Sequence, residues 1–152
     1  MLLKKSIALA VAASAGLLLA LPASAQQFAK TEDAVKYRQG AFDVLAAHFG
    51  RMGAMANDKA PYDAKAAQES AEIVAFMSKL PWAGFAPGAE GGNAKPEIWK
   101  ERAKFDDLAK KMQEEVAKLD AAAKTGKLDD LKTAFAAAGK SCKACHDDFK
   151  KK

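Results

Sequence analysis

Two cysteines and a histidine stand close together near the C-terminal end of the sequence, as Cys142, Cys145 and His146. The C-x-x-C-H spacing is typical of covalent c-type haem attachment. In that chemistry each thiol adds to one vinyl group of the porphyrin, and the histidine becomes an axial ligand of the iron. Residues three apart on a helix share a face, so both thiols can reach one edge of a porphyrin. The motif therefore predicts one covalently bound haem c.

Three other interpretations of the motif fit the sequence less well. A thioredoxin-like redox pair belongs at a strand-to-helix junction, whereas Cys142 and Cys145 fall late in a helical pattern. A zinc site needs four ligands and would have to recruit His48, while the adjacent Cys145 and His146 point different ways on a helix. A disulfide between residues i and i+3 of a helix would be strained.

Hydrophobic periodicity predicts four helices to position this motif. Thr31 is the predicted N-cap of the first helix, Pro81 ends the second, and Pro96 suits the first turn of the third. The inward stripe predicted for the second helix is Ala66, Ser70, Ile73, Met77 and Leu80, with Val74 beside it. The predicted ranges are 31–50 or slightly beyond, 62–80, 96–126 and 128–149.

The spacing of the apolar residues also predicts how these helices pack. Steps of three and four residues favour packing at shallow angles, and short connections after the first and third helices favour antiparallel neighbours. Few residues are β-branched, which excludes a sheet of any size. We therefore expect an all-α fold, an antiparallel up-down-up-down four-helix bundle with the haem near one end.

The long connection between the second and third helices is the most unusual segment. Its 14 residues, 82–95, are rich in glycine and proline, which predicts no regular structure. Trp82 and Phe85 would not remain in water, so we expect them to pack near the haem or to cap the bundle. Loops of this length in compact domains are often functional.

The composition fits one exported domain. The chain has 152 residues, of which 28% are charged and 50% hydrophobic. Two lysines precede an apolar run, and Ala23-Ser24-Ala25 has the form of a signal-peptidase site. The run is shorter than the roughly 20 residues of a membrane span. We expect residues 1–25 to be a cleaved signal peptide and residues 26–152 to be the mature periplasmic domain.

The charge pattern excludes one class of partner. Removal of Lys4 and Lys5 lowers the formal net charge from +5 to +3. Acidic and basic residues are interspersed, except in the tail Lys150-Lys151-Lys152. Nucleic-acid binding would require a clustered basic face, so we expect no nucleic-acid partner.

These features resemble the cytochrome c′ family, the high-spin class II c-type cytochromes. The resemblance covers the chain from about Gln27 to the lysine tail. Small class I cytochromes carry the C-x-x-C-H motif near the N-terminus instead. The most specific segments are Asp33-Ala34-Val35-Lys36-Tyr37-Arg38-Gln39, Leu80-Pro81-Trp82 with the loop to Pro96-Glu97-Ile98-Trp99, and Cys142-Lys143-Ala144-Cys145-His146.

The resemblance implies three groups of site residues: ligands, neighbours of the haem edge, and residues above and below the iron. They are Cys142 and Cys145 as covalent haem ligands, His146 as axial iron ligand, Arg38 and Gln39 beside the haem edge, Asn93 facing it from another side, Phe42 covering the open sixth coordination site, and Lys150 on the proximal side.

The residues by themselves leave several of these roles open. Arg38 falls on an apolar stripe, where its partner is either a haem propionate or solvent at the bundle end. His48 is either a second axial ligand or a surface residue. The methionines are core or surface filler. Lys150 lies four residues after His146 and is expected beside the imidazole on the same helix, unless it only begins a solvated tail.

The resemblance also implies a function. A five-coordinate, high-spin iron under an apolar cover would bind the small gases nitric oxide and carbon monoxide, in nitric oxide buffering or detoxification, with electron transfer as an additional role. We expect no enzyme, because no acid–base residue is placed for catalysis. The redox partner is not identified, and the family suggests a homodimer through the first two helices. The alternative is a low-spin class II cytochrome that carries electrons in the periplasm.

Overall fold

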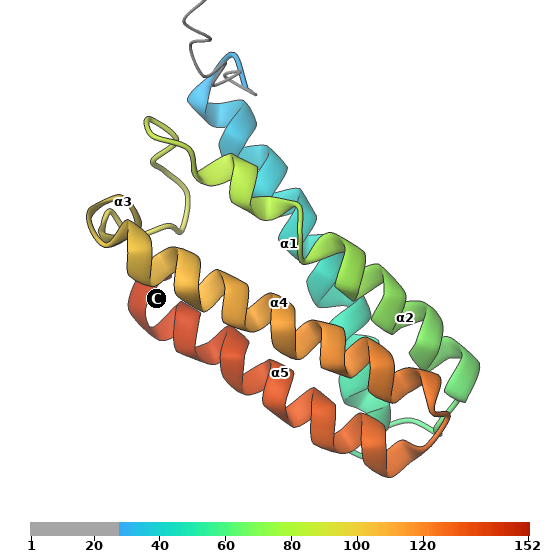
Figure 1. The fold of residues 1–152 in the computed structure, drawn as a ribbon. Helices are drawn as coiled ribbons and strands as arrows, with labels where there is room; N and C mark the ends of the chain where they lie inside the picture. The colour runs from blue at the N-terminus through green and yellow to red at the C-terminus, as the bar shows by residue number, and fades with distance from the viewer. Residues whose placement is uncertain (1–27) are drawn as a thin grey trace, which may run out of the picture.

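The computed structural model describes residues 28–152, which form five α-helices and one short 3₁₀ helix (Figure 1). The expected signal peptide, residues 1–25, lies outside the described residues. Within residues 28–152 the only β-structure is an isolated bridge between Ala94 and Lys150, and no helix is both long and apolar enough to cross a bilayer. The helices are α1 (Thr31–Ala56), α2 (Ala64–Met77), η1 (Pro81–Phe85), α3 (Glu97–Lys100), α4 (Arg102–Lys124) and α5 (Leu128–Phe149).

The four long helices form the predicted bundle. Helix α1 packs against α2 and α5, and α4 packs against α2 and α5. The α1–α2 and α4–α5 connections lie at one end, whereas η1, α3 and the C-terminus lie at the other (Figure 1). The prediction of an all-α four-helix bundle is confirmed.

Local chemistry explains two of the helix boundaries. Asp63 caps α2, because its Oδ1 accepts hydrogen bonds from the amides of Lys65 at 2.9 Å and Ala66 at 3.0 Å. Thr31 was predicted to cap α1, and this is wrong: it is the first helical residue, and its hydroxyl donates to the Gly88 carbonyl at 2.9 Å. A contact with a distant loop has taken the place of a local cap.

The predicted third helix is interrupted. Glu101, with φ −111° and ψ 44°, separates α3 from α4. Around this break Trp99 Nε1 donates to the Ala86 carbonyl at 3.0 Å, and Arg102 Nη1 donates to the Phe85 carbonyl at 2.8 Å. The predicted single helix is thus divided into α3 and α4, and residues on both sides of the break donate hydrogen bonds to the preceding segment.

The loop prediction is also corrected in part. Residues 81–85 form the 3₁₀ helix η1, which Pro81 can start because its ring fixes φ. The Trp82 indole supports this turn by donating to the Ser78 carbonyl at 2.7 Å. The remainder lacks helix as predicted, and Gly88, Gly91 and Gly92 adopt positive φ there.

Helix α2 presents a slightly different face from the one predicted. Ile73 was assigned to the inward stripe, but it is 36% exposed. Ser70 and Val74 are buried as expected, and Ala67 and Ala71 share their face. The face that α2 presents to α1 and α4 is thus rotated away from Ile73.

Two hydrophobic clusters divide the bundle along its length. The cluster we call the closed-end core is mostly aliphatic and contains Leu45, Met52, Met55, Ala67, Ala71, Val74, Met112, Val116, Leu119, Ala123, Leu131 and Ala138. The cluster we call the aromatic cluster contains Phe85, Ile98, Phe105 and Phe149, with Phe42, Trp82, Ala94, Trp99, Leu108 and Cys145 packed against it half-buried.

Candidate haem site

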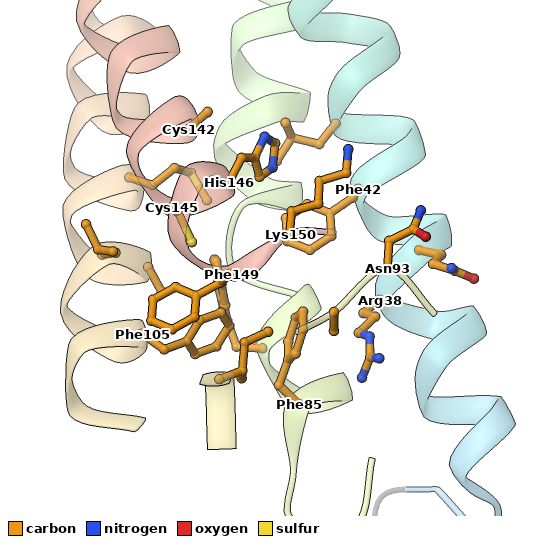
Figure 2. Close-up of a pocket in the computed structure, with 18 of the residues that line it drawn as sticks. Arg38, Phe42, Phe85, Asn93, Phe105, Cys142, Cys145, His146, Phe149 and Lys150 are labelled. Carbon is orange, nitrogen blue, oxygen red and sulfur yellow. The ribbon is translucent and has the colours of Figure 1, made fainter. Parts of the chain in front are cut away.

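A cavity of about 440 Å³ lies at the end of the bundle that holds the aromatic cluster (Figure 2). Its volume falls in the range of small-molecule sites, roughly 300–1,000 Å³. The side chains around it come from α1, η1, the loop, α3, α4 and α5. The lining includes all eight residues singled out in the sequence: Arg38, Gln39, Phe42, Asn93, Cys142, Cys145, His146 and Lys150.

Helix α5 carries the two thiols one turn apart, and both are half-buried against the cavity. Neither thiol is in a disulfide. Burial raises the pKa of Cys142, and burial together with the neighbouring Cys142 and Asp148 raises the pKa of Cys145 to about 11. Both groups are therefore reduced, protonated thiols at neutral pH.

His146 lies where the cavity meets a more open hollow of about 710 Å³. Partial burial lowers the pKa of its imidazole, the positive charge of Lys150 lowers it further, and Asp147 opposes these effects. The neutral ring is therefore favoured, and this is the form that ligates a metal. Within residues 28–152 no three His, Cys, Asp or Glu side chains gather in the geometry of a metal site.

Lys150 lies beside His146, but not for the predicted reason (Figure 2). Helix α5 ends at Phe149, and Lys150 is extended, with φ −106° and ψ 133°. The following chain pairs with the loop, since the Lys151 amide donates to the Asn93 carbonyl at 2.8 Å. On the other side of Lys150, the Lys95 amide donates to the Phe149 carbonyl at 2.9 Å. The expectation that Lys150 continues the helix is wrong, and backbone pairing with the loop holds it in place.

Phe42 is half-buried on α1 and is held by other aromatic rings. Its ring centroid lies 5.9 Å from that of Trp82 and 6.4 Å from that of Phe85. Trp82 and Phe85 both line the cavity. Of the two expected positions, near the haem or capping the bundle, the structure shows the first. His48 also belongs to α1 but is absent from the lining.

The sequence did not identify several apolar residues of the cavity wall. The signal for them was present in the helical stripes, since Phe149 follows Cys145 by four residues on the same face. What the stripes did not reveal is where the bundle opens. The missed lining residues include Ile98, Phe105, Leu108, Met112 and Phe149.

Arg38 is almost fully buried, with 3% of its surface exposed, so it does not extend into solvent at the bundle end. Its guanidinium donates to three loop carbonyls, of Gly84, Ala89 and Gly91. Desolvation by burial lowers its pKa, which nearby Glu90 partly offsets. Gln39 and Asn93 are exposed at the cavity edge.

The donor set fits a c-type haem. Two protonated thiols and a neutral imidazole line one apolar cavity, and the aromatic walls suit a flat hydrophobic ring. The fold and the site together define a class of protein, a helical-bundle c-type cytochrome.

Known proteins narrow this class. Residues 33–150 match the family described as Cytochrome C'. The cytochrome c′ of Alcaligenes xylosoxydans xylosoxydans is 52% identical over 126 residues, which cover 83% of this chain and 99% of that protein. The cytochrome c′ of Rubrivivax gelatinosus is 49% identical over 129 residues, covering 83% of this chain and all of that protein (100%).

Solved structures agree. A nitric oxide complex of a variant of cytochrome c prime from Alcaligenes xylosoxidans superposes with a TM-score of 0.79 at 51% identity, covering 82% of this chain and 98% of that chain. The chain therefore belongs to the cytochrome c′ family, and the resemblance stated from the sequence is confirmed.

Proposed function

We propose that residues 26–152 form a periplasmic c-type haem protein with a five-coordinate, high-spin iron that binds nitric oxide and carbon monoxide, and that it buffers or detoxifies nitric oxide. Cys142 and Cys145 carry one haem c through two thioethers, and His146 is its axial ligand. A bound haem supplies an iron centre at which a small neutral gas can bind. The protein is not an enzyme, and electron transfer is an additional role.

The observation that carries this proposal is the phenyl ring of Phe42 in the cavity wall. A phenyl ring offers no lone pair to iron, whereas a methionine or histidine at this place would. Its contacts with Trp82 and Phe85 surround it with aromatic carbon rather than with a hydrogen-bond donor aimed at a bound ligand. Neutral gases need only displace the ring. The nitric oxide complex of the Alcaligenes relative supports the same ligand class.

One spectrum tests the proposal. The ferrous protein, purified after export, is expected to show broad high-spin absorption without sharp α and β bands, and to change on addition of carbon monoxide. Sharp bands in the absence of carbon monoxide, with no change on its addition, would contradict a five-coordinate iron.

Lys150 is proposed to weaken the bond between His146 and iron. Both side chains line the cavity and the adjoining hollow, and the cation lowers the pKa of the imidazole. A proximal imidazole beside a cation is a weaker donor than one backed by a carboxylate. Lys150→Ala is expected to raise the iron–histidine stretching frequency in resonance Raman spectra, whereas Lys152→Ala serves as the matched tail control. An unchanged frequency in Lys150→Ala would leave Lys150 without a proximal role.

A low-spin electron carrier is the second candidate, and one observation favours it. Met112 lines the cavity with 5% of its surface exposed, so a thioether sulfur is available in the wall. It is also a member of the closed-end core, packed among aliphatic side chains. If Met112→Leu converts a low-spin spectrum into a high-spin one, the electron-carrier function is correct and gas binding is secondary.

The homodimer implied by the family stays a proposal. Among residues 28–152, the exposed large apolar side chains are Val44 on α1 and Ile73 and Phe76 on α2. Phe76 is 63% exposed. Burying them against a second copy of the chain would remove apolar surface from water. Sedimentation of Phe76→Lys alongside the parent protein tests this; a dimer of unchanged stability would place the interface elsewhere.

A further inference from the structure

We propose that Arg38 is a positioning residue that gathers the loop after η1 into a wall of the haem cavity, so that the cavity is shaped by the polypeptide itself. This inference rests on the proposed haem site, but it assigns Arg38 a role toward the chain rather than toward a haem propionate alone.

The hydrogen bonds of Arg38 bring together three carbonyls that are not adjacent in the sequence. Its Nη1 donates to Gly84 O at 2.5 Å and to Ala89 O at 2.6 Å, and its Nη2 donates to Gly91 O at 2.7 Å. Gly84 lies in the last turn of η1, and Ala89 and Gly91 lie in the irregular loop that follows, where the Gly91 carbonyl accepts one backbone hydrogen bond, from the Ala94 amide at 3.3 Å. A buried carbonyl without a partner is costly, so the guanidinium supplies what secondary structure would otherwise supply.

The donor count limits what else Arg38 can do. A guanidinium has five N–H groups. Three of them are already used by the loop carbonyls, which leaves two for any carboxylate of a cofactor. The first partner of Arg38 is therefore the loop.

Packing around the guanidinium supports the same role. Its central carbon lies 4.5 Å from the centroid of the Phe85 ring and 5.8 Å from that of the Trp99 ring. A Cβ added at Gly84 would lie 2.7 Å from the Ala34 carbonyl oxygen and 2.8 Å from Arg38 Cβ. The loop thus approaches α1 so closely that only glycine fits at position 84.

The contacts extend from Arg38 to the cover of the proposed gas site. Phe85 is stacked beneath the guanidinium and lines the cavity, and it also packs against Phe42 (Figure 2). Loosening the loop would therefore remove a support of Phe42. The loop is also bound by Trp99 and Arg102, so removing Arg38 loosens it without detaching it.

The test compares Arg38→Lys with Arg51→Lys in the full haem-loaded protein. Arg51 is an exposed arginine on the same helix, so this control makes the same chemical change away from the loop. We measure hydrogen–deuterium exchange of peptides covering residues 84–95 and the rate of carbon monoxide association. A lysine cannot serve three divergent carbonyls, so exchange in this peptide is expected to become about tenfold faster or more, while α5 peptides are unchanged. Carbon monoxide is expected to associate faster, because the support of Phe42 is weakened.

Gly84→Ala provides a second variant that leaves the charge of Arg38 in place. It should give the same faster exchange, because the added methyl group separates the loop from α1. If Arg38→Lys alters only the pH dependence of the reduction potential, and exchange in residues 84–95 equals that of the Arg51→Lys control, Arg38 serves the propionate and the inference is wrong. If the parent protein fails to bind carbon monoxide, the proposed function fails, but the exchange data still decide the role of Arg38.

Discussion

The two ends of the bundle are built from different kinds of side chain. The closed-end core is built mainly of aliphatic, alanine and methionine side chains, and Val74, Leu119 and Leu131 in it are completely buried. The aromatic cluster instead surrounds a cavity of about 440 Å³, and Phe42, Trp82 and Trp99 remain half-buried. One end of the bundle completes its packing with its own residues, and the other does not.

The closed-end core contributes mainly to the stability of the fold, whereas the aromatic end provides the binding cavity. Small, well-packed side chains fill space efficiently and allow the helices to approach closely. Phe105 and Phe149 instead touch edge to face, with centroids 5.4 Å apart, and together form part of the wall of the cavity. We therefore expect substitutions at the closed end to change the free energy of unfolding, and substitutions at the aromatic end to change haem content and gas binding.

The largest effect is expected from the attachment motif. A Cys142→Ser/Cys145→Ser variant should lose covalent haem completely, because no thioether can form. The parent protein should have the mass of residues 26–152 plus one haem. The haem should remain with the protein after acid–acetone extraction. Ala144→Ser changes an exposed position within the motif and should keep the haem. Extraction of haem from the parent protein would refute the thioether assignment.

Truncation in the closed-end core should mainly change stability. Leu131 is completely buried, so Leu131→Ala is expected to lower the free energy of unfolding by about 2–5 kcal/mol. Leu131→Met conserves volume and should cost less than about 1.5 kcal/mol. Denaturant titration measures both values. A large change in carbon monoxide kinetics in Leu131→Ala would show that the two ends are coupled.

Phe42→Ala and Phe49→Ala make the same change two turns apart on α1, where Phe42 lines the cavity and Phe49 packs against the closed-end core. Both rings are half-buried, and Phe49 stacks on Phe135 with centroids 4.3 Å apart. Removing the Phe42 ring should speed carbon monoxide association by about tenfold, equivalent to about 1.4 kcal/mol of barrier, since the ring no longer needs to be displaced. Stopped-flow mixing of the ferrous proteins gives the rates. Equal rates in Phe42→Ala and Phe49→Ala would place the cover elsewhere.

The smallest effect is expected from a buried carboxylate on α4. Hydrogen bonds from Lys111 and Lys118 hold the pKa of Glu115 below its usual value. Because the folded-state pKa is lowered, this group stabilises the fold above its unfolded pKa, and the contribution disappears as pH falls through the folded value. Glu115→Gln should lower the unfolding temperature at pH 7, and the difference should shrink as pH falls below the ordinary Glu pKa of about 4.3 and vanish below the lowered folded value. Glu114→Gln, at an exposed neighbour, is the control, and a pH-independent difference would indicate a packing effect instead.

Much of the candidate site could be predicted because chemistry and periodicity coincide at a few residues. Cys142, Cys145 and His146 have a spacing that only a small number of structures use, and the two cysteines fall on the inward stripe of a helix. Phe42 and Arg38 lie one turn apart on one stripe of α1, which brings both to the same cavity. The spacing of apolar residues within one helix is enough to predict which of its faces is buried.

Other features depended on contacts between distant segments. The break at Glu101 accompanies hydrogen bonds from α3 and α4 to the loop carbonyls, and helix propensity contains no information about those acceptors. The outward position of Ile73 depends on how α2 is rotated where it packs against α1 and α4. Lys150 leaves the helix because the chain on either side of it pairs with residues more than fifty positions earlier.

The amino-acid sequence by itself determined the helical class, the approximate helix ranges and the haem-binding motif, because these follow from interactions within a few residues along the chain. Only the tertiary structure decided where the bundle opens, which rings line the opening, and that Arg38 binds the loop carbonyls. Those outcomes depend on how α1, the loop and α5 meet in space. A buried guanidinium and three carbonyls satisfy one another only after segments about fifty residues apart have come together.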